Sequence, residues 1–348
     1  MCQILNYDIN RIIETNLPWQ EFSGKTVLIT GASGLLPAYL VETLLYLNEK
    51  QLCEKVNVIG IVRNKDYAKN KFRHHKNNKY LNLLEADVNN LIHIDSKIDI
   101  IIHAASHASP KYYAVDPVGT LSPNIIGTKN LLELGVKKKI KSFMFFSSGE
   151  VYGKTTDASL EKLSESSYYW LDPMDVRSCY AESKRMGETM CVAWGKQYSF
   201  DVKVVRPFHT YGPGMKLDDG RVFADFVSNI VNGEDIVMKS DGSHKRPFCY
   251  ISDATVGFFT VLLKGESANA YNVANPTQNV SIKALAETLI DLFPEKKLKV
   301  KRVTVNQSQY MRSPIIEQVP DISKLIKLGW MPKIDIREGF YHTIRSYL

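Results

Sequence analysis

The chain has few cysteines and no pairing pattern among them. The five cysteines are an odd number, lie far apart and form no C-x-x-C pair: Cys2, Cys53, Cys179, Cys191 and Cys249. Disulfide frameworks and cysteine-based zinc sites both depend on characteristic cysteine spacings. We therefore expect neither a disulfide framework nor a metal site.

The sequence also lacks a long apolar run. Its longest apolar stretches, such as residues 256–263, are far too short to cross a bilayer. The first residues, Met-Cys-Gln-Ile-Leu-Asn-Tyr-Asp, have neither the basic start nor the apolar run of a signal peptide. We therefore expect a cytoplasmic protein without a membrane partner.

Charge is not concentrated in one large patch. The net charge is +7, and the positive residues are spread along the 348-residue chain. This distribution favours a small phosphate-bearing substrate over a nucleic-acid partner. One basic cluster occurs at residues 65–79 and includes His74 and His75. We interpret this cluster as a solvated loop.

What is present is a regular alternation of apolar strands and amphipathic helices. Strands are predicted at residues 25–30, 56–62, 80–86, 98–103, 142–147 and 203–206, and helices at 35–48, 121–134 and 179–196. This alternation predicts an α/β protein with a doubly wound, Rossmann-type parallel sheet.

Three regions are expected. Residues 1–24 are predicted to be a helical extension, and residues 25–207 a nucleotide-binding domain. From residue 208 the pattern weakens, and prolines and glycines punctuate short elements. Residues 208–348 are therefore expected to form a smaller substrate-binding lobe over the carboxyl edge of the sheet, with segments able to cross back.

A glycine pair marks the expected cofactor loop. Gly31 and Gly34 directly follow the first strand and open the first helix. Glycines let the backbone approach a pyrophosphate, and the helix N-terminus supplies free N–H groups. The third glycine of the usual pattern is replaced by Pro37, which is tolerated in a first helical turn, and Ala38 keeps the next position small.

The second and third strands end in residues that bear on cofactor choice. Arg63 follows the second strand, where an acid usually binds the adenosine ribose. Arginine can pair with a 2′-phosphate, which favours NADP. The alternative is that Arg63 stacks on adenine while NAD is bound. Asp87, after the third strand, is placed to meet the adenine amino group or to cap the next element.

Tyr180 and Lys184 are the candidate catalytic pair. They are four residues apart in a predicted helix and so share one face. A tyrosine base needs its pKa lowered from about 10 by roughly 3 units. A nearby ammonium and the positive nicotinamide ring could provide this shift. Ser148 follows the fifth strand, where its hydroxyl could bond the reacting oxygen, and Glu150 could move a proton at carbon.

Four segments together resemble a known family. They are Gly31-Ala-Ser-Gly34, His103-Ala-Ala, Ser148-Gly-Glu150-Val-Tyr-Gly153 and Tyr180-Ala-Glu-Ser-Lys184. The set resembles the extended short-chain dehydrogenase/reductases, in the subgroup of NAD-dependent epimerase/dehydratases that act on nucleotide sugars. The likeness runs from about residue 25 to the C-terminus. It implies cofactor contacts from Gly31, Ser33, Gly34, Leu35, Arg63, Asp87, Val88, His103, Ala104, Ala105, Tyr180 and Lys184.

Within that family the sequence is most similar to UDP-glucuronate decarboxylases. The similar segments are Ala105-Ser-His-Ala-Ser-Pro110 with Tyr112-Tyr113, Val176-Arg-Ser-Cys-Tyr180, Thr210-Tyr-Gly-Pro-Gly-Met215, Asp219-Gly-Arg221-Val and Lys245-Arg246-Pro-Phe248. The resemblance implies that Ser148 and Tyr180 hold the C4 oxygen and that Lys184 holds the nicotinamide ribose. It implies substrate contacts from Ser109, Lys111, His209, Arg221, Arg246 and Arg312, with the three arginines at the diphosphate.

The sequence departs from those relatives at three places. Ser148-Gly149-Glu150 stands where the decarboxylases have Thr-Ser-Glu and the dTDP-glucose 4,6-dehydratases have Thr-Asp-Glu, so the acid of the latter mechanism is missing. His209 replaces an asparagine, and Lys111 replaces a proline. GDP-mannose 4,6-dehydratases, which use NADP, also resemble residues 60–63.

The predicted activity is oxidation of a nucleotide sugar at C4, with Tyr180 as base. The 4-ketone can then lose CO₂ from C6, lose water across C5–C6, or take hydride back on the other face. We expect a decarboxylase, with 4-epimerase and 4,6-dehydratase as alternatives. A catalytically silent redox-sensing module is the alternative from another class, but it need not retain the serine, tyrosine and lysine. By analogy with the family, helices 121–134 and 179–196 are expected to form a homodimer interface.

Overall fold

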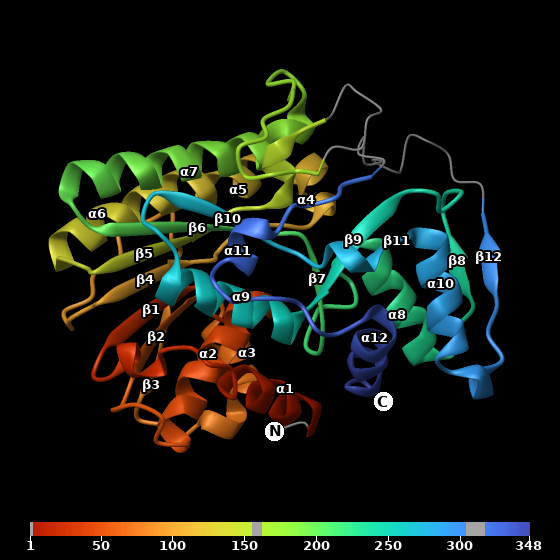
Figure 1. Cartoon of the computed structure of the whole chain (residues 1–348), viewed down its shortest axis with the longest axis horizontal. Helices are drawn as coiled ribbons and strands as arrows, with labels where there is room; N and C mark the ends of the chain where they lie inside the picture. Colours follow the sequence, from red (N-terminus) through yellow and green to blue (C-terminus); the bar gives the residue numbers. More distant parts are fainter. Residues whose placement is uncertain (1–2, 155–161, 304–316) are drawn as a thin grey trace.

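The computed structural model describes residues 3–154, 162–303 and 317–348, and its centre is a seven-stranded parallel sheet (Figure 1). The strands are β1 (Thr26–Thr30), β2 (Asn57–Val62), β3 (Leu81–Glu85), β4 (Ile100–His103), β5 (Ser142–Phe146), β6 (Asp201–Pro207) and β10 (Asn269–Val273). Their order is β10-β6-β5-β4-β1-β2-β3. The direction of winding reverses between β1 and β4, which opens a crevice at the carboxyl ends of these strands. The predicted fold class is confirmed.

Helices cover both faces of the sheet (Figure 1). Because successive strand side chains point to opposite faces, Val27 and Ile29 of β1 enter one core while Leu28 enters the other. The first face carries α1 (Gln3–Ile13), α2 (Leu35–Glu49), α3 (Lys65–Lys71) and α9 (Ile251–Lys264); the second carries α5 (Pro117–Ser122), α6 (Thr128–Lys138) and α7 (Cys179–Tyr198).

A smaller lobe lies beside the carboxyl edge of the sheet. Its strands are β7 (His209–Tyr211), β8 (Ile236–Met238), β9 (Lys245–Tyr250), β11 (Asn279–Ser281) and β12 (Val300–Arg302), and its helices are α8 (Val222–Asn232), α10 (Ile282–Asp291) and α12 (Ile336–Arg345). Strands β11, β9 and β7 form one sheet, and β12 pairs with β8. Helix α9 and strand β10 return from this part of the chain to the large sheet, and α11 (Ser323–Ile326) packs near them.

The N-terminal extension is docked on the first face of the sheet, against α2 and α9. Helix α1 is followed by a 3₁₀ turn at Trp19–Phe22. Asp8 is fully buried, and its Oδ2 accepts hydrogen bonds from the hydroxyls of Tyr39 (2.8 Å) and Tyr250 (3.0 Å). One carboxylate therefore joins α1 to α2 and to the end of β9.

Two sequence-based expectations are corrected. The helix expected at residues 121–134 is interrupted by a π turn at Pro123–Gly127 between α5 and α6, because proline lacks an N–H and crowds the preceding turn. The basic cluster at residues 65–79 is not a solvated loop. It contains α3 and a 3₁₀ turn at Arg73–His75, in which His75 is buried. Across the described ranges, no helix combines the length and apolarity needed to cross a membrane.

Candidate active site

A cavity of about 970 Å³ lies at the carboxyl ends of strands β1–β5, between the two lobes. Most predicted site residues line it: Gly31, Ser33, Gly34, Leu35, Arg63, Asp87, Val88, Ala104, Ala105, Ser109, Lys111, Ser148, Glu150, Tyr180, Lys184, His209, Arg221 and Arg246. His103 lies beneath the lining. Arg312 lies outside the described residues. The fold thus brings the cofactor loop, the tyrosine–lysine helix and the second lobe to one space.

The glycine loop has the shape of a dinucleotide cradle. Gly31 has a φ of +66°, and a Cβ there would lie 2.9 Å from the Cα of Ala105. Only glycine allows this approach without a shift of the backbone. Gly34 caps α2, and its carbonyl accepts from the Ala38 N–H (3.1 Å). Pro37 occupies the first turn of α2, so it removes no helical hydrogen bond. These residues fit a bound pyrophosphate.

His103 supports this cradle from below. Its Nε2 donates to the Pro123 carbonyl (3.0 Å), so its Nδ1 accepts from the Thr30 hydroxyl (2.8 Å). Thr30 Oγ1 in turn accepts from the Ala104 and Ala105 N–H groups. Burial, aided by the charge of Lys184, lowers the pKa of His103 to about 3. His103 is therefore a neutral residue that fixes the floor of the cavity.

Arg63 and Asp87 lie at neighbouring strand ends on the cofactor side. Arg63 is exposed, and its Nη1 lies 2.7 Å from His107 Nε2. Burial and then the charge of Arg63 lower the pKa of His107. Asp87 accepts a hydrogen bond from the Asn89 N–H (2.9 Å), which closes a turn rather than capping a helix. Both side chains border the part of the cavity that adjoins β2 and β3.

Tyr180 and Lys184 lie in the first two turns of α7. The ring of Tyr180 stacks on Tyr113, with centroids 5.1 Å apart and planes 15° apart. Lys184 Nζ donates to the Phe146 carbonyl (2.6 Å) and lies 5.8 Å from the centre of the Tyr180 ring. Tyr180 also shares a side-chain hydrogen bond with Ser148. Serine, tyrosine and lysine therefore converge at the end of β5.

Burial dominates the electrostatics of this group. It raises the pKa of Tyr180 to about 12, although the hydrogen bond with Ser148 acts in the other direction. It lowers the pKa of Lys184 to about 7, against the charge of Glu188. In the protein alone, burial therefore outweighs the effects that lower the tyrosine pKa. A bound oxidised nicotinamide would add a positive charge that lowers it.

The turn after β5 carries one carboxylate into the cavity. Ser148 Oγ accepts from the Glu150 N–H (3.2 Å) at the start of a 3₁₀ turn, Gly149–Tyr152. A Cβ on Gly149 would lie 2.7 Å from the ring of Phe208. The Gly149 carbonyl accepts from Gln318 Nε2 (3.3 Å). Phe208 therefore fills the space that a side chain at position 149 would need.

The segment after Ser109 is tied to a turn of the second lobe. The Ser109 hydroxyl donates to the Asp219 carbonyl, and Lys111 Nζ donates to the Asp218 carbonyl (2.8 Å). Arg221 Nε donates to Asp219 Oδ2 (2.7 Å). Helix α4 (Pro110–Val115) and the Arg221 turn thus form one wall of the cavity.

His209 faces the cationic side of the cavity. Burial and then the charges of Arg246 and Arg221 hold the pKa of His209 well below its usual range, so the imidazole is neutral. Its Nδ1 is buried and has no hydrogen-bond partner among the described residues. Arg246 is buried, and its Nη1 donates to the Lys245 carbonyl (2.7 Å). A neutral ring beside two guanidinium groups is suited to an anionic, hydrogen-bonding ligand.

Sequence reasoning assigned no role to several residues that line the same space. Arg177 lies in a 3₁₀ turn, Val176–Ser178, and its buried Nη1 has no hydrogen-bond partner in the described part of the chain. Its position three residues before Tyr180 was the available signal. His107 contacts Arg63, and Gln318 donates to the Gly149 carbonyl. Both contacts join distant segments, so no local sequence pattern could predict them.

The fold and this site together are those of a Rossmann-type, nicotinamide-dependent enzyme. The model of the NAD dependent epimerase/dehydratase family matches residues 27–274. The chain belongs to this family, as the sequence predicted.

Within the family, similar proteins include UDP-glucuronic acid decarboxylases. The chain is 33% identical to UDP-glucuronic acid decarboxylase 6 of Arabidopsis thaliana over 322 residues, which covers 91% of this chain and 87% of that protein. It is 31% identical to UDP-glucuronic acid decarboxylase 1 of Xenopus tropicalis, over 94% of this chain and 73% of that protein.

Solved structures share the fold at lower identity. UDP-glucuronic acid 4-epimerase from Bacillus cereus, in complex with UDP-glucuronic acid and NAD, has a TM-score of 0.77 at 21% identity over 92% of this chain and 98% of that chain. The dTDP-glucose 4,6-dehydratase from Bacillus anthracis, in complex with NAD, has a TM-score of 0.76 at 21% identity over 93% of this chain and 96% of that chain.

Proposed function

We propose that this protein decarboxylates UDP-glucuronate through a 4-keto intermediate. The likeness to decarboxylases over nine-tenths of the chain supports the substrate. The joining of Ser148, Glu150, Tyr180 and Lys184 in one cavity supports the chemistry. The dinucleotide, when bound at the Gly31 loop, supplies the hydride acceptor.

The side chains have distinct parts in this proposal. Tyr180 takes the proton of the C4 hydroxyl, and Ser148 hydrogen-bonds the same oxygen. Lys184 holds the ammonium charge near the tyrosine ring. Once C4 is a ketone, the C6 carboxylate is part of a β-keto acid. The C5–C6 bond breaks, CO₂ leaves, and its electron pair forms an enolate that takes up a proton at C5, with Glu150 at this side of the sugar. Hydride return to C4 then restores the hydroxyl, so the reaction is redox-neutral.

The observation that carries decarboxylation over dehydration is the contact of Gly149 with Phe208. Loss of water from C6 needs an acid to protonate the leaving hydroxyl. The position beside Glu150 holds no such acid, and the Phe208 ring occupies the space for one. Loss of CO₂ needs no protonated leaving group.

The cationic wall supports an acidic nucleotide sugar. Arg221 and Arg246 are placed for the diphosphate, and Arg177 and Lys111 lie on the same cavity for a further carboxylate. Arg–phosphate and Arg–carboxylate pairs are among the strong hydrogen bonds of proteins. Arg312 stays a predicted diphosphate contact.

We also propose NADP as the preferred form of the cofactor and a homodimer as the assembly. Arg63 is exposed at the end of β2, where a 2′-phosphate would be recognised. The dimer is supported by exposed apolar side chains on the α6–α7 side: Ile126, Met186, Val192 and Tyr198 are each 39–49% exposed. These side chains expose apolar area on the two segments for which the family resemblance implies a dimer interface.

A panel assay tests the function. Purified protein with added NAD or NADP is incubated with UDP-glucuronate, UDP-glucose, and GDP- and CDP-hexoses, and products are identified by mass spectrometry. We expect a product lighter by CO₂ from UDP-glucuronate alone. A product of unchanged mass would indicate a 4-epimerase, and no turnover of any sugar would favour a silent redox module.

A further inference from the structure

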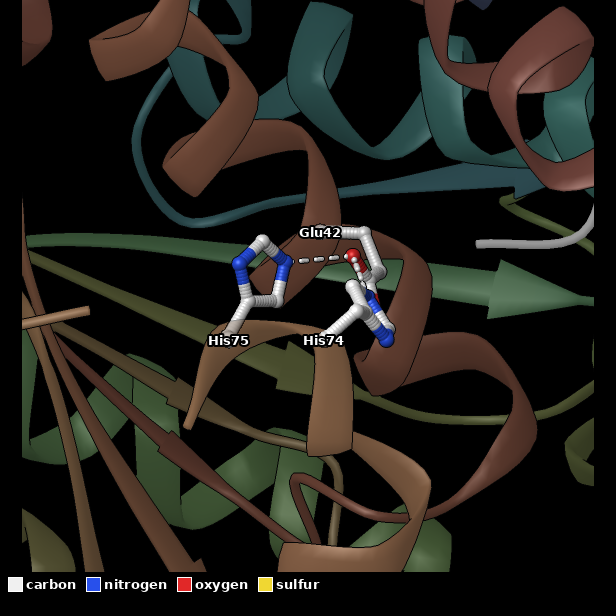
Figure 2. A group of neighbouring side chains, drawn as sticks. All are labelled: Glu42, His74 and His75. Carbon is white, nitrogen blue, oxygen red and sulfur yellow. Dashed lines mark hydrogen bonds and ion pairs between the residues drawn. The ribbon is translucent and has the colours of Figure 1, made fainter. Parts of the chain in front are cut away.

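We propose that Glu42, His74 and His75 form a binding site for one divalent transition-metal ion of the zinc class, outside the active-site cavity. Glu42 lies in the middle of α2, and the two histidines lie in the 3₁₀ turn at Arg73–His75 (Figure 2). None of the three lines the cavity. The expectation of no metal site rested on cysteine spacing. The ligands here are a glutamate and two histidines that only the fold brings together.

The two imidazole rings converge on the Glu42 carboxylate (Figure 2). His75 Nε2 lies 2.8 Å from Glu42 Oε2, and His74 Nε2 lies 3.0 Å from both carboxylate oxygens. Glu42 and His75 are buried, with side chains 4% and 5% exposed, and His74 is reachable from solvent at 21%. The site thus has two fixed ligands and one open side through which an ion can enter.

The spacing of the donor atoms suits a tetrahedral ion. Zinc lies about 2.0–2.2 Å from histidine nitrogen and carboxylate oxygen, so its ligands are about 3.3 Å apart. The nitrogen–oxygen distances here are a few tenths of an ångström shorter, and all the ligand atoms lie within 4.8 Å of one another. A small outward movement of the two rings would admit the ion, which would replace the Nε2 protons.

A second carboxylate supports this exchange. Glu49, two turns along α2 from Glu42, places Oε1 4.0 Å from Nδ1 of His75. A neutral imidazole that binds metal through Nε2 carries its proton on Nδ1, and a carboxylate there commonly holds that tautomer. At 4.0 Å the two atoms are not hydrogen-bonded; an approach of about 1 Å by the exposed Glu49 side chain would complete a carboxylate–histidine–metal chain, with the metal position between Nε2 and Glu42.

The ligand types select the kind of ion. Lys71 lies close enough to interact with Glu42, and its ammonium offsets part of the carboxylate charge for any divalent cation alike. Magnesium and calcium depend on several oxygen ligands, whereas imidazole ligands suit zinc, cobalt and nickel. Two imidazoles and one partly offset carboxylate therefore favour zinc over magnesium. With three protein ligands, the fourth position is left to water.

The site would join two elements that flank the cofactor loop. Helix α2 starts at the glycine cradle, and the Arg73–His75 turn follows α3, which begins just after Arg63. A metal bound only by the folded chain raises its stability by mass action. The metal has a structural role here, since the three ligands lie away from the catalytic side chains.

The test uses tag-free, full-length protein and Zn²⁺, Co²⁺ or Mg²⁺ as the probe. We expect one Zn²⁺ per chain by calorimetry, a Tm raised by several degrees, a visible absorption spectrum with Co²⁺, and no response to Mg²⁺. His75→Asn and Glu42→Gln should each weaken zinc binding by at least tenfold. Glu49→Gln should weaken it by about 10-fold, because it acts through the His75 tautomer.

His93→Asn is the matched control, since His93 is exposed and lies outside the cluster; it should leave the affinity unchanged. Circular dichroism of each metal-free variant checks that the fold is kept. Zinc binding that is absent from the wild type, or equally tight in His75→Asn and Glu42→Gln, would overturn the proposal. In that case the histidines serve only as hydrogen-bond donors to Glu42.

Discussion

At Tyr180, burial and the hydrogen bond with Ser148 act on the pKa of one phenol in opposite directions. Burial raises its pKa to about 12, and the Ser148 hydrogen bond lowers it only in part. A base that works near neutral pH therefore needs further stabilisation of the anion by several kcal/mol, at about 1.4 kcal/mol for each pKa unit. The residue type and its position after β5 could be predicted from sequence. The direction of the shift could not, because it depends on burial by Tyr113 and the second lobe.

Tyr180→Phe should lower turnover by at least about 100-fold while cofactor binding is kept. The phenol oxygen is the group assigned to C4 deprotonation, and removal of a general base typically costs 10²–10⁴-fold. The phenylalanine ring still stacks on Tyr113. Steady-state kinetics with cofactor titration checks this, and activity within a few fold of wild type would show that another group takes the proton.

Arg63 should make NADP bind more tightly than NAD. A charge-assisted pair with the 2′-phosphate is worth about 1.5–3 kcal/mol. Calorimetric titration of both cofactors into stripped protein measures the preference, and Arg63→Ala should remove it. Lys69→Ala, an exposed cation on α3, is the matched control. Equal or tighter NAD binding by the wild type would leave Arg63 as a surface or adenine-stacking residue.

At the scale of elements, sequence periodicity located six of the seven strands of the large sheet and most helices that carry the site; it did not locate β10. It failed at a proline inside an expected helix and where tertiary contacts decide the outcome. Pro123 widens the expected helix into a π turn, and the histidines of the 65–79 segment turn inward to Glu42. The contact between Ser109 and Asp219 joins residues 110 positions apart. Such contacts are invisible to any local pattern.

The docking of α1 should make stability depend on pH through Asp8. Burial raises its pKa from 3.8 to about 7, against the hydrogen bonds from Tyr39 and Tyr250. The folded state then binds a proton more tightly than the unfolded chain. The free energy of unfolding should fall as pH rises from about 4 to about 7, by up to about 4 kcal/mol for three pKa units.

Asp8→Asn should remove that part of the pH dependence, because asparagine stays neutral. Thermal melting of both proteins at several pH values between 4 and 8 gives the difference. We expect the stability of the variant, relative to that of the wild type, to be higher above pH 7 than at pH 4. A constant difference across this range would show that Asp8 does not titrate there.

A buried ion pair should hold the catalytic helix to the sheet. Arg206 of β6 donates from Nε (2.9 Å) and Nη2 (2.6 Å) to Glu188 of α7, and Glu188 also accepts from Ser147, next to Ser148. Glu188→Gln or Arg206→Met should destabilise the protein by about 3–5 kcal/mol, because each change leaves the partner buried and unpaired.

The double variant Arg206→Met/Glu188→Leu should recover part of that loss, since no charge then stays buried. Denaturant or thermal unfolding measures each variant. Removal of the exposed pair Lys129–Glu133 is the control and should cost less than about 1 kcal/mol. A loss for Arg206→Met as small as this control would mean that the pair does not anchor α7.

For the molecule as a whole, the order of motifs along the chain was enough to predict the fold class and the family. Tight loops and strand ends carry local signals, so the glycine cradle and the tyrosine–lysine pair could be found. The shape of the substrate cavity could not, because α9 and β10 return to the large sheet and the second lobe closes over Glu150. The space beside Gly149 is filled by Phe208, between β6 and β7, and this contact supports decarboxylation over dehydration.

The most direct test of the decarboxylase account is CO₂ release from UDP-glucuronate by wild type and Glu150→Gln, with product mass measured in the same samples. The account predicts CO₂ and a correspondingly lighter nucleotide sugar from wild type, and a loss of at least about 100-fold in Glu150→Gln. Glu182→Gln, which changes an acid outside the cavity lining, should be unaffected. A product of unchanged mass, made equally well by wild type and Glu150→Gln, would contradict the account.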